Sequence, residues 1–514
     1  MFCTQSSSVV LLLALLISWG VYHGFKHRSA PLPPGPRPLP FVGNALQMPR
    51  HNIAQSLASL SEEYGDVIYM HVFGIKFIIL NCAEAVLELL DHRGALYSER
   101  PHSVMAMDMI EKKHAVLFHQ YDENLKKHRR LLRNAVDAKR SEDYWQMQYA
   151  ESHKLMAAFL TSPDDFIAHL RRSAGAFTLR LAYGYEVQGG PGEDAFVNLA
   201  EELARVTGVA SEPGRWLVDA FPWLRHVPAW FPGAGFRRWA DHARRIIDDF
   251  ATQPYLSSKE AALQGISSFA SETTEFVEAE TGRPLTRDED EFLKWTSASI
   301  YSVGGTDTAV AVNSAFLLLM ALYPAAQRKA QDEIETIVGK DRLAVMEDRP
   351  RLPYIEALMK EVHRFIPITP LVPHSTRVDD EYRGYRIPKG SWVIANTWAV
   401  MRDPRLFPEP EVFWPERYLA EGNRCTEDPR DYAFGYGRRR CPGVHVAESS
   451  FFIFVTHFLA VFTVSNPVDE RGQKLTSPGP STDAHISHPR PFRCTIKPRN
   501  QALTELIVQL KSFS

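Results

Sequence analysis

The sequence predicts a mainly α-helical fold with small β-sheets, an α+β arrangement within one large body. Across most of the roughly three hundred residues after position 91, apolar side chains recur with the 3.6-residue spacing of helices. Runs with strand-like composition are short, and we expect them to pair into small sheets. These runs cover residues 67–72, 76–80, 383–387, 392–396 and 493–496.

The overall composition is that of an ordinary globular protein. The chain has 514 residues, of which 45% are hydrophobic and 23% are charged. The 58 Lys and Arg residues against 61 Asp and Glu residues leave a net charge of −3, which argues against nucleic acid as a partner. Five cysteines include no C-x-x-C pair, so zinc and disulfide frameworks are not expected.

The N-terminus differs from the rest of the chain because residues 9–22 form an apolar run without a charge. The run is short against the roughly 20 residues that a spanning helix needs, so a cleaved signal peptide is an alternative. Lys26 and Arg28 follow the run and no Lys or Arg precedes it, which places the following chain on the cytosolic side. We predict a transmembrane anchor over residues 1–28.

Prolines dominate the next segment, residues 31–40. This density of proline fixes an extended and stiff backbone without internal hydrogen bonds. We therefore predict a hinge over residues 29–50 that sets the angle between the anchor and the body, with a flexible linker as the alternative. No linker divides the remainder, so residues 51–514 are expected to form one domain.

The body begins with elements of mixed type and continues with helices. Residues 53–64 have the spacing of a short amphipathic helix, the strand-like runs at 67–72 and 76–80 follow, and residues 83–91 predict another helix. Residues 295–320 predict one long helix with weak polarity on every side, which we expect to be buried.

That long helix carries two successive glycines, Gly304 and Gly305, followed by Asp307 and Thr308. A glycine within a helix costs about 1 kcal/mol relative to alanine, so a pair indicates a groove where a ligand approaches the backbone. Burying polar side chains such as Asp307 and Thr308 in an apolar helix costs free energy unless they bind a partner. The alternative is that Asp307 pairs with a distant arginine and the Thr308 hydroxyl bonds to the preceding turn.

A loop near the C-terminus surrounds one cysteine with the groups that a metal-bound thiolate needs. Its members are Phe434, Gly437, Arg439, Cys441 and Gly443, in the pattern F-x-x-G-x-R-x-C-x-G. A helix is predicted to begin after Gly443, and its N-terminal N–H groups would stabilise a thiolate. Gly437 permits a turn and a close approach to a flat ligand, Arg439 offers a guanidinium to a carboxylate, and Phe434 covers the sulfur. The alternative is a buried core cysteine.

This loop resembles the haem-binding loop of the cytochrome P450 family, and the likeness extends over residues 33–498. The resemblance implies the cytochrome P450 fold, with haem b between the long central helix and the cysteine loop and with Cys441 as the axial iron ligand. Residues 304–308 resemble the family's oxygen-binding motif. By that likeness Gly305 lines the cofactor, Thr308 hydrogen-bonds dioxygen or its water partner, and Asp307 relays protons from solvent.

Other site residues are implied by family position. Glu361, Arg364 and Arg417 match the family's buried Glu-Arg-Arg cluster, which braces the haem loop, although a surface ion pair is the alternative for the first two. Arg129, His374 and Arg439 are the cations implied for the haem propionates. Leu125 stands where the family usually has tryptophan, so one donor to a propionate is missing, with an effect that the sequence does not define.

The resemblance implies a monooxygenase on the cytosolic face of the endoplasmic reticulum membrane. It would use O2 and two electrons from NADPH, delivered through the flavins of a partner reductase, to oxidise a small apolar molecule. The closing motif SHPRPF resembles fungal secondary-metabolite enzymes and suggests a terpenoid, with an aromatic polyketide or indole as the alternative. A haem-thiolate isomerase or dehydratase, which needs no O2, and a non-catalytic haem sensor are the competing classes.

Two surface features remain open on the sequence alone. The basic run Lys126, Lys127, Arg130 and Arg133 is either a solvated helix face or a docking patch for an acidic flavoprotein. Residues 211–236 are rich in Trp, Phe and Pro, which suits either a substrate entrance at the bilayer or an ordinary core. With residues 102–117, 300–304, 366–372 and 485–486, they occupy the family's substrate-contact positions.

Overall fold

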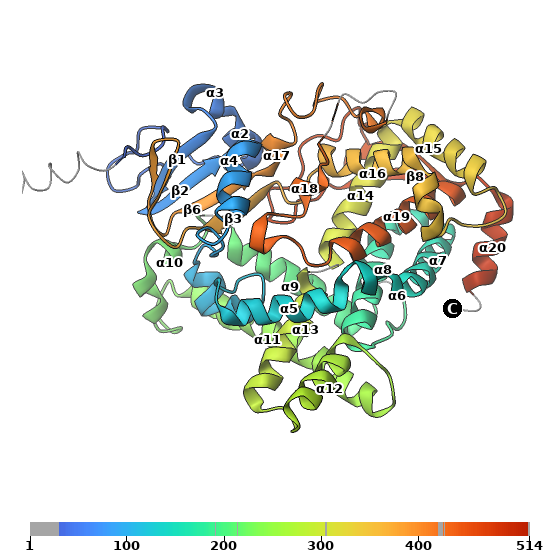
Figure 1. Ribbon diagram of the computed structural model, residues 1–514, viewed down its shortest axis with the longest axis horizontal. Coiled ribbons are helices and arrows are strands. Elements are labelled where there is room, and N and C mark those ends of the chain that lie inside the picture. The colour runs from blue at the N-terminus through green and yellow to red at the C-terminus, as the bar shows by residue number, and fades with distance from the viewer. Residues whose placement is uncertain are drawn as a thin grey trace, which may run out of the picture.

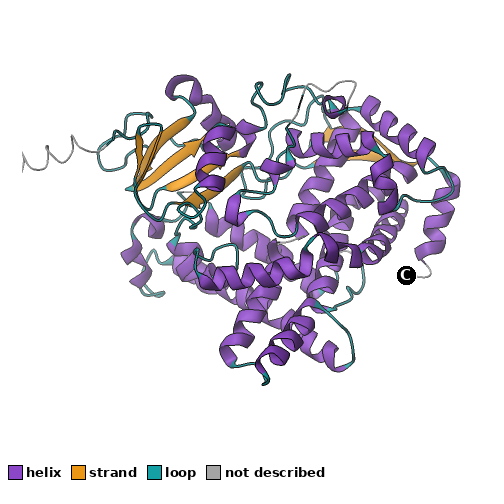
Figure 2. Cartoon of the chain, in the orientation of Figure 1, coloured by secondary structure: helices purple, strands orange, loops and turns teal. Residues whose placement is uncertain are grey.

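The computed structural model describes residues 30–190, 192–212, 214–303, 306–419, 425 and 427–511. The predicted anchor over residues 1–28, together with Gly304 and Gly305, lies outside the described residues. Figure 2 shows that helices form most of the molecule and that the largest sheet lies at one end. The predicted fold class, mainly α with small sheets, is therefore confirmed.

Three sheets are present among the described residues. The largest contains β1 (Val67–Val72), β2 (Ile75–Leu80), β3 (Leu371–Ser375) and β6 (Trp392–Asn396), in the order β1-β2-β6-β3. Strand β2 pairs in parallel with β6, so the start of the body joins a segment more than three hundred residues later, as the blue and orange strands of Figure 1 show. Two antiparallel ribbons complete the set: β4 (Asp380–Tyr382) with β5 (Tyr385–Ile387), and β7 (Phe462–Asp469) with β8 (Phe492–Pro498).

The helices differ in length, and several predicted ones are divided. The expected helix over 53–64 consists of two that meet at Leu60, and the expected helix over 83–91 continues as a π-helical turn over Leu87–His92. The α-helices are α2 (Ile53–Ser59), α3 (Ser61–Tyr64), α4 (Ala83–Val86), α5 (Glu123–Val136), α6 (Ala138–Asp143), α7 (Trp145–Thr161), α8 (Phe166–Tyr183), α9 (Ala195–Ser211), α10 (Leu217–Ala220), α11 (Gly235–Leu263), α12 (Phe269–Thr281), α13 (Arg287–Val303), α14 (Thr306–Leu322), α15 (Pro324–Ile337), α16 (Pro353–Phe365), α17 (Thr397–Val400), α18 (Arg430–Ala433), α19 (Val444–Val461) and α20 (Gln501–Lys511).

The core of the helical part is built around α14 and α19, which Figure 1 shows running through the middle of the molecule. Phe316 of α14 packs edge-on against three aromatic rings of α19, those of Phe451, Phe454 and Phe458. Such pairs add about 0.5–1.5 kcal/mol each beyond the area they bury. The helix that carries Asp307 and Thr308 and the helix that follows the cysteine loop are therefore fixed to one another.

Two apolar segments, Arg287–Leu322, which contains α13 and α14, and Val444–Val461, are long and apolar enough to cross a membrane. Their most apolar windows are 65% and 78% buried within the protein. Burial of that extent is the behaviour of core helices, because a helix that is apolar on all sides needs apolar surroundings.

Candidate functional site: the cysteine loop and its cationic surroundings

The cysteine loop runs from α18 to α19, and its backbone is held in a fixed path. The Cys441 N–H donates to the Phe434 carbonyl at 2.7 Å. Gly435 and Gly437 both have positive φ, at 76° and 51°, which side chains with a Cβ rarely adopt. Helix α19 begins at Val444 with Gly443 as its N-cap residue, as predicted from the sequence.

Gly437 also packs against a second segment of the chain. A Cβ at this position would lie 2.1 Å from the Leu90 carbonyl oxygen, so a glycine is needed for the close approach of the turn at 87–92. The Gly437 N–H also donates to the Asp91 carboxylate. A Cβ at Gly443 would meet nothing within 4 Å. The turn at 87–92 therefore contacts the cysteine loop directly at Gly437.

Replacing Gly437 by alanine is expected to destabilise the loop. A residue with a Cβ pays about 1–2 kcal/mol in the left-handed region, and the contact with Leu90 adds to this. The measurements are the free energy of unfolding and the haem content of the purified variant. Gly384→Ala is the control, because Gly384 also has positive φ, at 77°, but has nothing within 4 Å of its Cβ position. Equal losses in both variants would contradict a role for the Leu90 contact.

Cys441 is half-buried in the loop. Burial raises its pKa, while the Gly443 N–H and the charges of Arg129 and Arg440 lower it. The groups that lower this pKa are a backbone donor at a helix N-terminus and nearby guanidinium groups, and these are the groups that stabilise a thiolate. The loop therefore provides the environment of a metal-bound sulfur.

Four basic side chains gather near the cysteine loop: His374 and Arg439 are buried, and Arg100 and Arg129 are half-buried. Arg439 donates to the carbonyls of Ser98 and His119, at 2.8 and 2.6 Å. Arg129, on α5, donates to the Arg440 carbonyl at 2.6 Å. Arg100 donates to the Leu117 and Pro373 carbonyls. These three arginines form no ion pair with a carboxylate in the described part of the chain.

The pKa values of this cationic cluster are lowered, because burial and the repulsion between like charges both disfavour the protonated forms. Burial and then the charges of Arg100 and Arg129 lower the pKa of Arg439 to about 9. Burial and then Arg129 lower that of Arg100 to about 10. Burial and then Arg100 and Arg439 lower that of His374 to about 3. Two carboxylates placed among these groups would remove the repulsion.

His374, on β3, has one nitrogen without a partner. Its Nδ1 lies 2.7 Å from the Tyr97 carbonyl oxygen, whereas the fully buried Nε2 has no hydrogen-bond partner among the described residues. A buried polar atom left unpaired costs about 1–3 kcal/mol. The unpaired nitrogen, the unbalanced arginines and the open space at Gly443 together fit haem, whose propionates would bind the cations and whose iron would bind the sulfur.

Sequence reasoning missed Arg100 as a member of the cationic cluster. Its side chain reaches the site through contacts with Leu117 and with Pro373 of β3, and the latter residue is 273 positions away along the chain. No local motif marks such a contact. Leu125, on α5, is fully buried within the apolar core, in agreement with its not being given a polar role.

Asp307 has a partner that the sequence did not indicate. Its Oδ1 lies 2.9 Å from the His488 Nε2, and both side chains are partly exposed. His488 is fixed by its backbone, because its N–H donates to the Thr482 hydroxyl and its carbonyl accepts from the Thr482 N–H. The alternative expected for Asp307, pairing with a distant arginine, is thus replaced by pairing with a histidine. Thr308 is half-buried in the same turn of α14.

Glu361, Arg364 and Arg417 form the buried cluster that the resemblance implied. Arg364 binds both carboxylate oxygens of Glu361, at 2.7 and 2.9 Å, and Arg417 binds the same carboxylate at 3.1 Å. All three side chains are completely buried. The alternative of an exposed ion pair between Glu361 and Arg364 is therefore wrong, and a charge removed from this cluster would leave its partners uncompensated.

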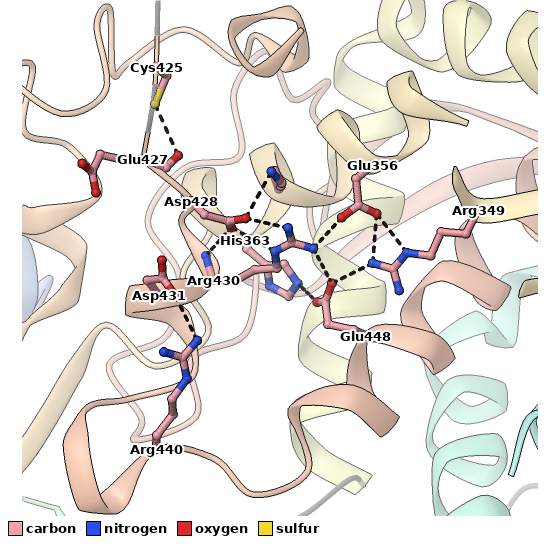
Figure 3. A network of polar contacts seen from close by, with 11 residues as sticks. Arg349, Glu356, His363, Cys425, Glu427, Asp428, Arg430, Asp431, Arg440 and Glu448 are labelled. Carbon is pink, nitrogen blue, oxygen red and sulfur yellow. Dashed lines mark hydrogen bonds and ion pairs between the residues drawn. The ribbon is translucent and has the colours of Figure 1, made fainter. Parts of the chain in front are cut away.

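A second ionic network, which the sequence did not reveal, joins α16, α18 and α19 next to the cysteine loop (Figure 3). Arg430 of α18 binds Asp428, Glu356 and Glu448. Glu448 of α19 also binds His363, at 2.9 Å, and the His363 ring packs edge-on against Phe434 with centroids 5.5 Å apart. Glu448 of α19 therefore positions His363, and His363 positions the Phe434 ring, which the sequence predicts to cover the sulfur.

The cations of this second network determine the protonation state of Glu448. Burial alone raises the pKa of Glu448, but His363, Arg430 and Arg349 hold it at about 2. The carboxylate therefore stays ionised at neutral pH. A charged Glu448 in turn keeps α18, α16 and α19 together around the cysteine loop.

A mainly helical fold, a cysteine loop at the start of a buried helix and an enclosed set of cations define a haem-thiolate protein. The sequence model of the family described as cytochrome P450 matches residues 33–493, and the chain belongs to that family.

Relatives from fungi define the enzyme class more closely. The chain is 39% identical to cytochrome P450 monooxygenase claR of Ampulloclitocybe clavipes, over 93% of this chain and 89% of the relative. It is 36% identical to claT of the same organism, over 98% of each chain. It is 35% identical to tryptamine 4-monooxygenase of Psilocybe cyanescens, over 97% of this chain and 99% of the relative. The protein is a cytochrome P450 monooxygenase.

Proposed function

We propose that this enzyme is a membrane-anchored haem-thiolate monooxygenase that oxidises a small apolar molecule, a terpenoid intermediate of fungal secondary metabolism. The observation that carries the haem assignment is the cationic cluster beside Cys441, whose arginines form no ion pair with a carboxylate of the described chain. Haem b, when bound, supplies the activation of O2 for oxygen insertion into the substrate. Cys441 would hold its iron, and Arg100, Arg129, Arg439 and His374 would hold its propionates.

Proton delivery is the role we propose for Asp307 and Thr308. Breaking the O–O bond consumes protons, and an apolar pocket must be given donors. His488 binds Asp307 through Nε2, at 2.9 Å, and its Nδ1 forms no hydrogen bond within the described chain. A proton taken up at Nδ1 can be matched by one released from Nε2 to the Asp307 carboxylate, which then supplies the Thr308 hydroxyl.

Replacing His488 by glutamine is expected to separate NADPH consumption from product formation. Glutamine can still hydrogen-bond Asp307 but cannot pass a proton, so product formed per NADPH should fall by about tenfold to a hundredfold. Asp307→Asn should give a similar fall, and the double variant should be no worse than Asp307→Asn. The exposed His242→Gln, outside the predicted substrate-contact segments, is the control. Independent, multiplying effects of the two substitutions would refute a shared relay.

Electrons are proposed to enter beside α5, from the flavins of an NADPH-dependent reductase. Helix α5 adjoins the cysteine loop through the bond between Arg129 and the Arg440 carbonyl. On its outer face Lys127, Arg130 and Arg133 are exposed, and none forms an ion pair within the described chain. Free cations on this side suit an acidic partner and would speed its encounter with the enzyme.

Attachment to the endoplasmic reticulum membrane is proposed from the anchor over residues 1–28, the hinge over 29–50 and an apolar surface near the hinge. Leu46, Trp223 and Trp230 are 73%, 66% and 80% exposed, and Phe41 is completely exposed. Figure 1 shows that α10, which precedes Trp223, lies on the side where the described chain begins. Large apolar side chains so exposed are suited to the interface of a bilayer. The catalytic domain over 51–514 would then lie in the cytosol.

The proposed substrate class rests on likeness to other enzymes. The terpenoid assignment rests on the likeness of SHPRPF and of the cysteine loop to fungal secondary-metabolite enzymes. An indole substrate is the second candidate, because one relative of nearly full coverage is named tryptamine 4-monooxygenase. An aromatic polyketide follows from the same likeness.

The deciding experiment uses full-length protein in microsomes with a fungal reductase. Sesquiterpenes, diterpenes, indoles and aromatic polyketides are incubated with and without NADPH under 18O2. A terpenoid product that carries one 18O atom and requires NADPH supports the proposal. A labelled indole or polyketide product would replace the substrate class, and an unlabelled product formed without NADPH would show an isomerase or dehydratase. Absence of any substrate-dependent NADPH consumption would favour a haem sensor.

A further inference from the structure

A buried histidine lies between the cysteine loop and α19. His363, on α16, is only 6% exposed. Its ring packs edge-on against two phenylalanines, Phe434 of the cysteine loop at 5.5 Å and 62°, and Phe451 of α19 at 5.3 Å and 64°. Phe451 in turn packs edge-on against Phe316 of α14. His363 therefore joins the cysteine loop to the centre of the helical core.

The orientation of the His363 ring is set by its hydrogen bond to Glu448. The His363 Nε2 lies 2.9 Å from Oε1 of the Glu448 carboxylate. The other oxygen of this carboxylate accepts from Arg349 and from Arg430, each at 3.2 Å. Figure 3 shows Glu448 at the meeting point of these three side chains. Because the carboxylate is held by three partners, it keeps the imidazole in one orientation toward Phe434.

The sequence of α16 places His363 on a face of its own. Glu356, Lys360 and His363 follow one another at positions i, i+4 and i+7, so they share one face of the helix. Glu356 and Lys360 both form ion pairs within the second ionic network. Glu361 and Arg364, which form the completely buried cluster, lie on a different face. A substitution at His363 can therefore leave that cluster intact.

Phe434 is the link between His363 and the sulfur. Its carbonyl accepts from the Cys441 N–H at 2.7 Å, so the backbones of these two residues are held together. Its ring is half-buried, and packing decides which rotamer it keeps. Within the described chain, His363 supplies the aromatic contact to this ring. Apolar groups around a metal-bound sulfur control its access to water, the hydrogen bonds that it accepts and the reduction potential of the metal.

We propose that His363, held by Glu448, is a positioning residue that keeps the Phe434 ring over the Cys441 sulfur and thereby keeps the reduction potential of the haem iron low. This inference rests on the proposed ligation of the iron by Cys441 and names a residue that controls it. If the ring were displaced, water would donate hydrogen bonds to the sulfur. The thiolate would then give less electron density to the metal, and the ferrous form would be favoured.

The test separates the ring of His363 from its hydrogen bond. His363→Gln keeps a donor for Glu448 and loses the ring, whereas His363→Phe keeps a ring and loses the donor. The reduction potential of the purified, substrate-free haem protein is measured by titration with a reductant and a reference dye. In His363→Gln the equilibrium should shift about tenfold toward the ferrous form, which is about 59 mV for one electron. The potential of His363→Phe should lie closer to that of the wild type.

His169 provides a matched control. It is also 6% exposed, its ring packs edge-on against Phe159 at 6.0 Å and 64°, and its Nε2 lies 2.8 Å from the Ser162 hydroxyl. This contact joins α8 to α7 and not to the cysteine loop. His169→Gln should therefore lower the free energy of unfolding to a similar extent as His363→Gln but leave the reduction potential unchanged. An equal shift of the potential in both variants contradicts a specific role for His363.

A double variant tests whether the effect passes through Phe434. In a Phe434→Leu background, His363→Gln should cause no further shift of the potential, because the ring that it positions is absent. Shifts that add in the double variant rule out this route. His363→Leu, which loses both the ring and the donor, should shift the potential at least as far as His363→Gln and decides the question if His363→Gln does not fold.

Failure of this inference and failure of the proposed function give different results. If His363→Gln and His363→Leu keep the wild-type potential, and their reduced carbon monoxide complexes show the red-shifted Soret band of thiolate ligation, only the role of His363 is wrong. If the wild-type protein lacks that band, the haem-thiolate assignment itself is wrong.

Discussion

Replacing Cys441 by serine is expected to abolish the red-shifted Soret band of the reduced carbon monoxide complex and all NADPH-dependent product formation. A hydroxyl does not ionise in the environment that supports the Cys441 thiolate, and thiolate donation favours O–O bond cleavage. The backbone of the loop should keep its path, because the Cys441 N–H and the Phe434 carbonyl are unchanged. The readouts are the difference spectrum and the haem content.

Cys425→Ser is the matched control for this substitution. Cys425 is buried, and its thiol donates to the Leu406 carbonyl at 3.3 Å, a bond that a serine hydroxyl can replace. This variant should retain the red-shifted band and the activity. If Cys441→Ser also retains the band, the iron ligand is another residue and the proposed architecture of the site is wrong.

Replacing Glu361 by glutamine is expected to cause the largest loss of stability. The carboxylate neutralises two fully buried guanidinium groups, those of Arg364 and Arg417. Removing one charge from a buried cluster costs about 3–5 kcal/mol, because the remaining charges cannot return to water. The expected results are a lower free energy of unfolding in denaturant titrations and a loss of haem during purification.

An exposed pair of the same residue types provides the control. Glu202 and Arg205 of α9 have the same three-residue spacing and a 2.6 Å contact, but their side chains are 37% and 54% exposed. Glu202→Gln should therefore change stability by less than about 0.5 kcal/mol. Similar losses in Glu361→Gln and Glu202→Gln would contradict the view that burial makes the first cluster essential.

Local patterns account for the features that the sequence predicted correctly. The strands β1, β2 and β6 are short β-branched or aromatic runs, and the Cys441 loop is a compact motif. Strand β3 was missed because Pro373 lies within it, and proline is rare in strands other than those at an edge. Strand β7 was missed because its register shifts between Ser465 and Val468.

Long-range contacts account for the site residues that the sequence did not predict. His488 becomes relevant only because the chain brings it to Asp307, 181 residues away. Arg100 and His363 likewise reach the cysteine loop through packing, and no spacing in the sequence marks them. The roles given to Thr308 and Asp307 came from the family resemblance and stay predictions, as does the role of Gly305, which lies outside the described residues.

The enclosed cationic cluster also bears on the lifetime of the newly made chain. Before haem arrives, the repulsion among Arg100, Arg129 and Arg439 opposes closure of the protein around them. A ligand that binds only the folded state shifts the folding equilibrium in proportion to its concentration, so haem supply sets the fraction of chains that are folded. In an iron-starved cell the folded fraction of the enzyme should therefore fall even while its messenger RNA is still translated.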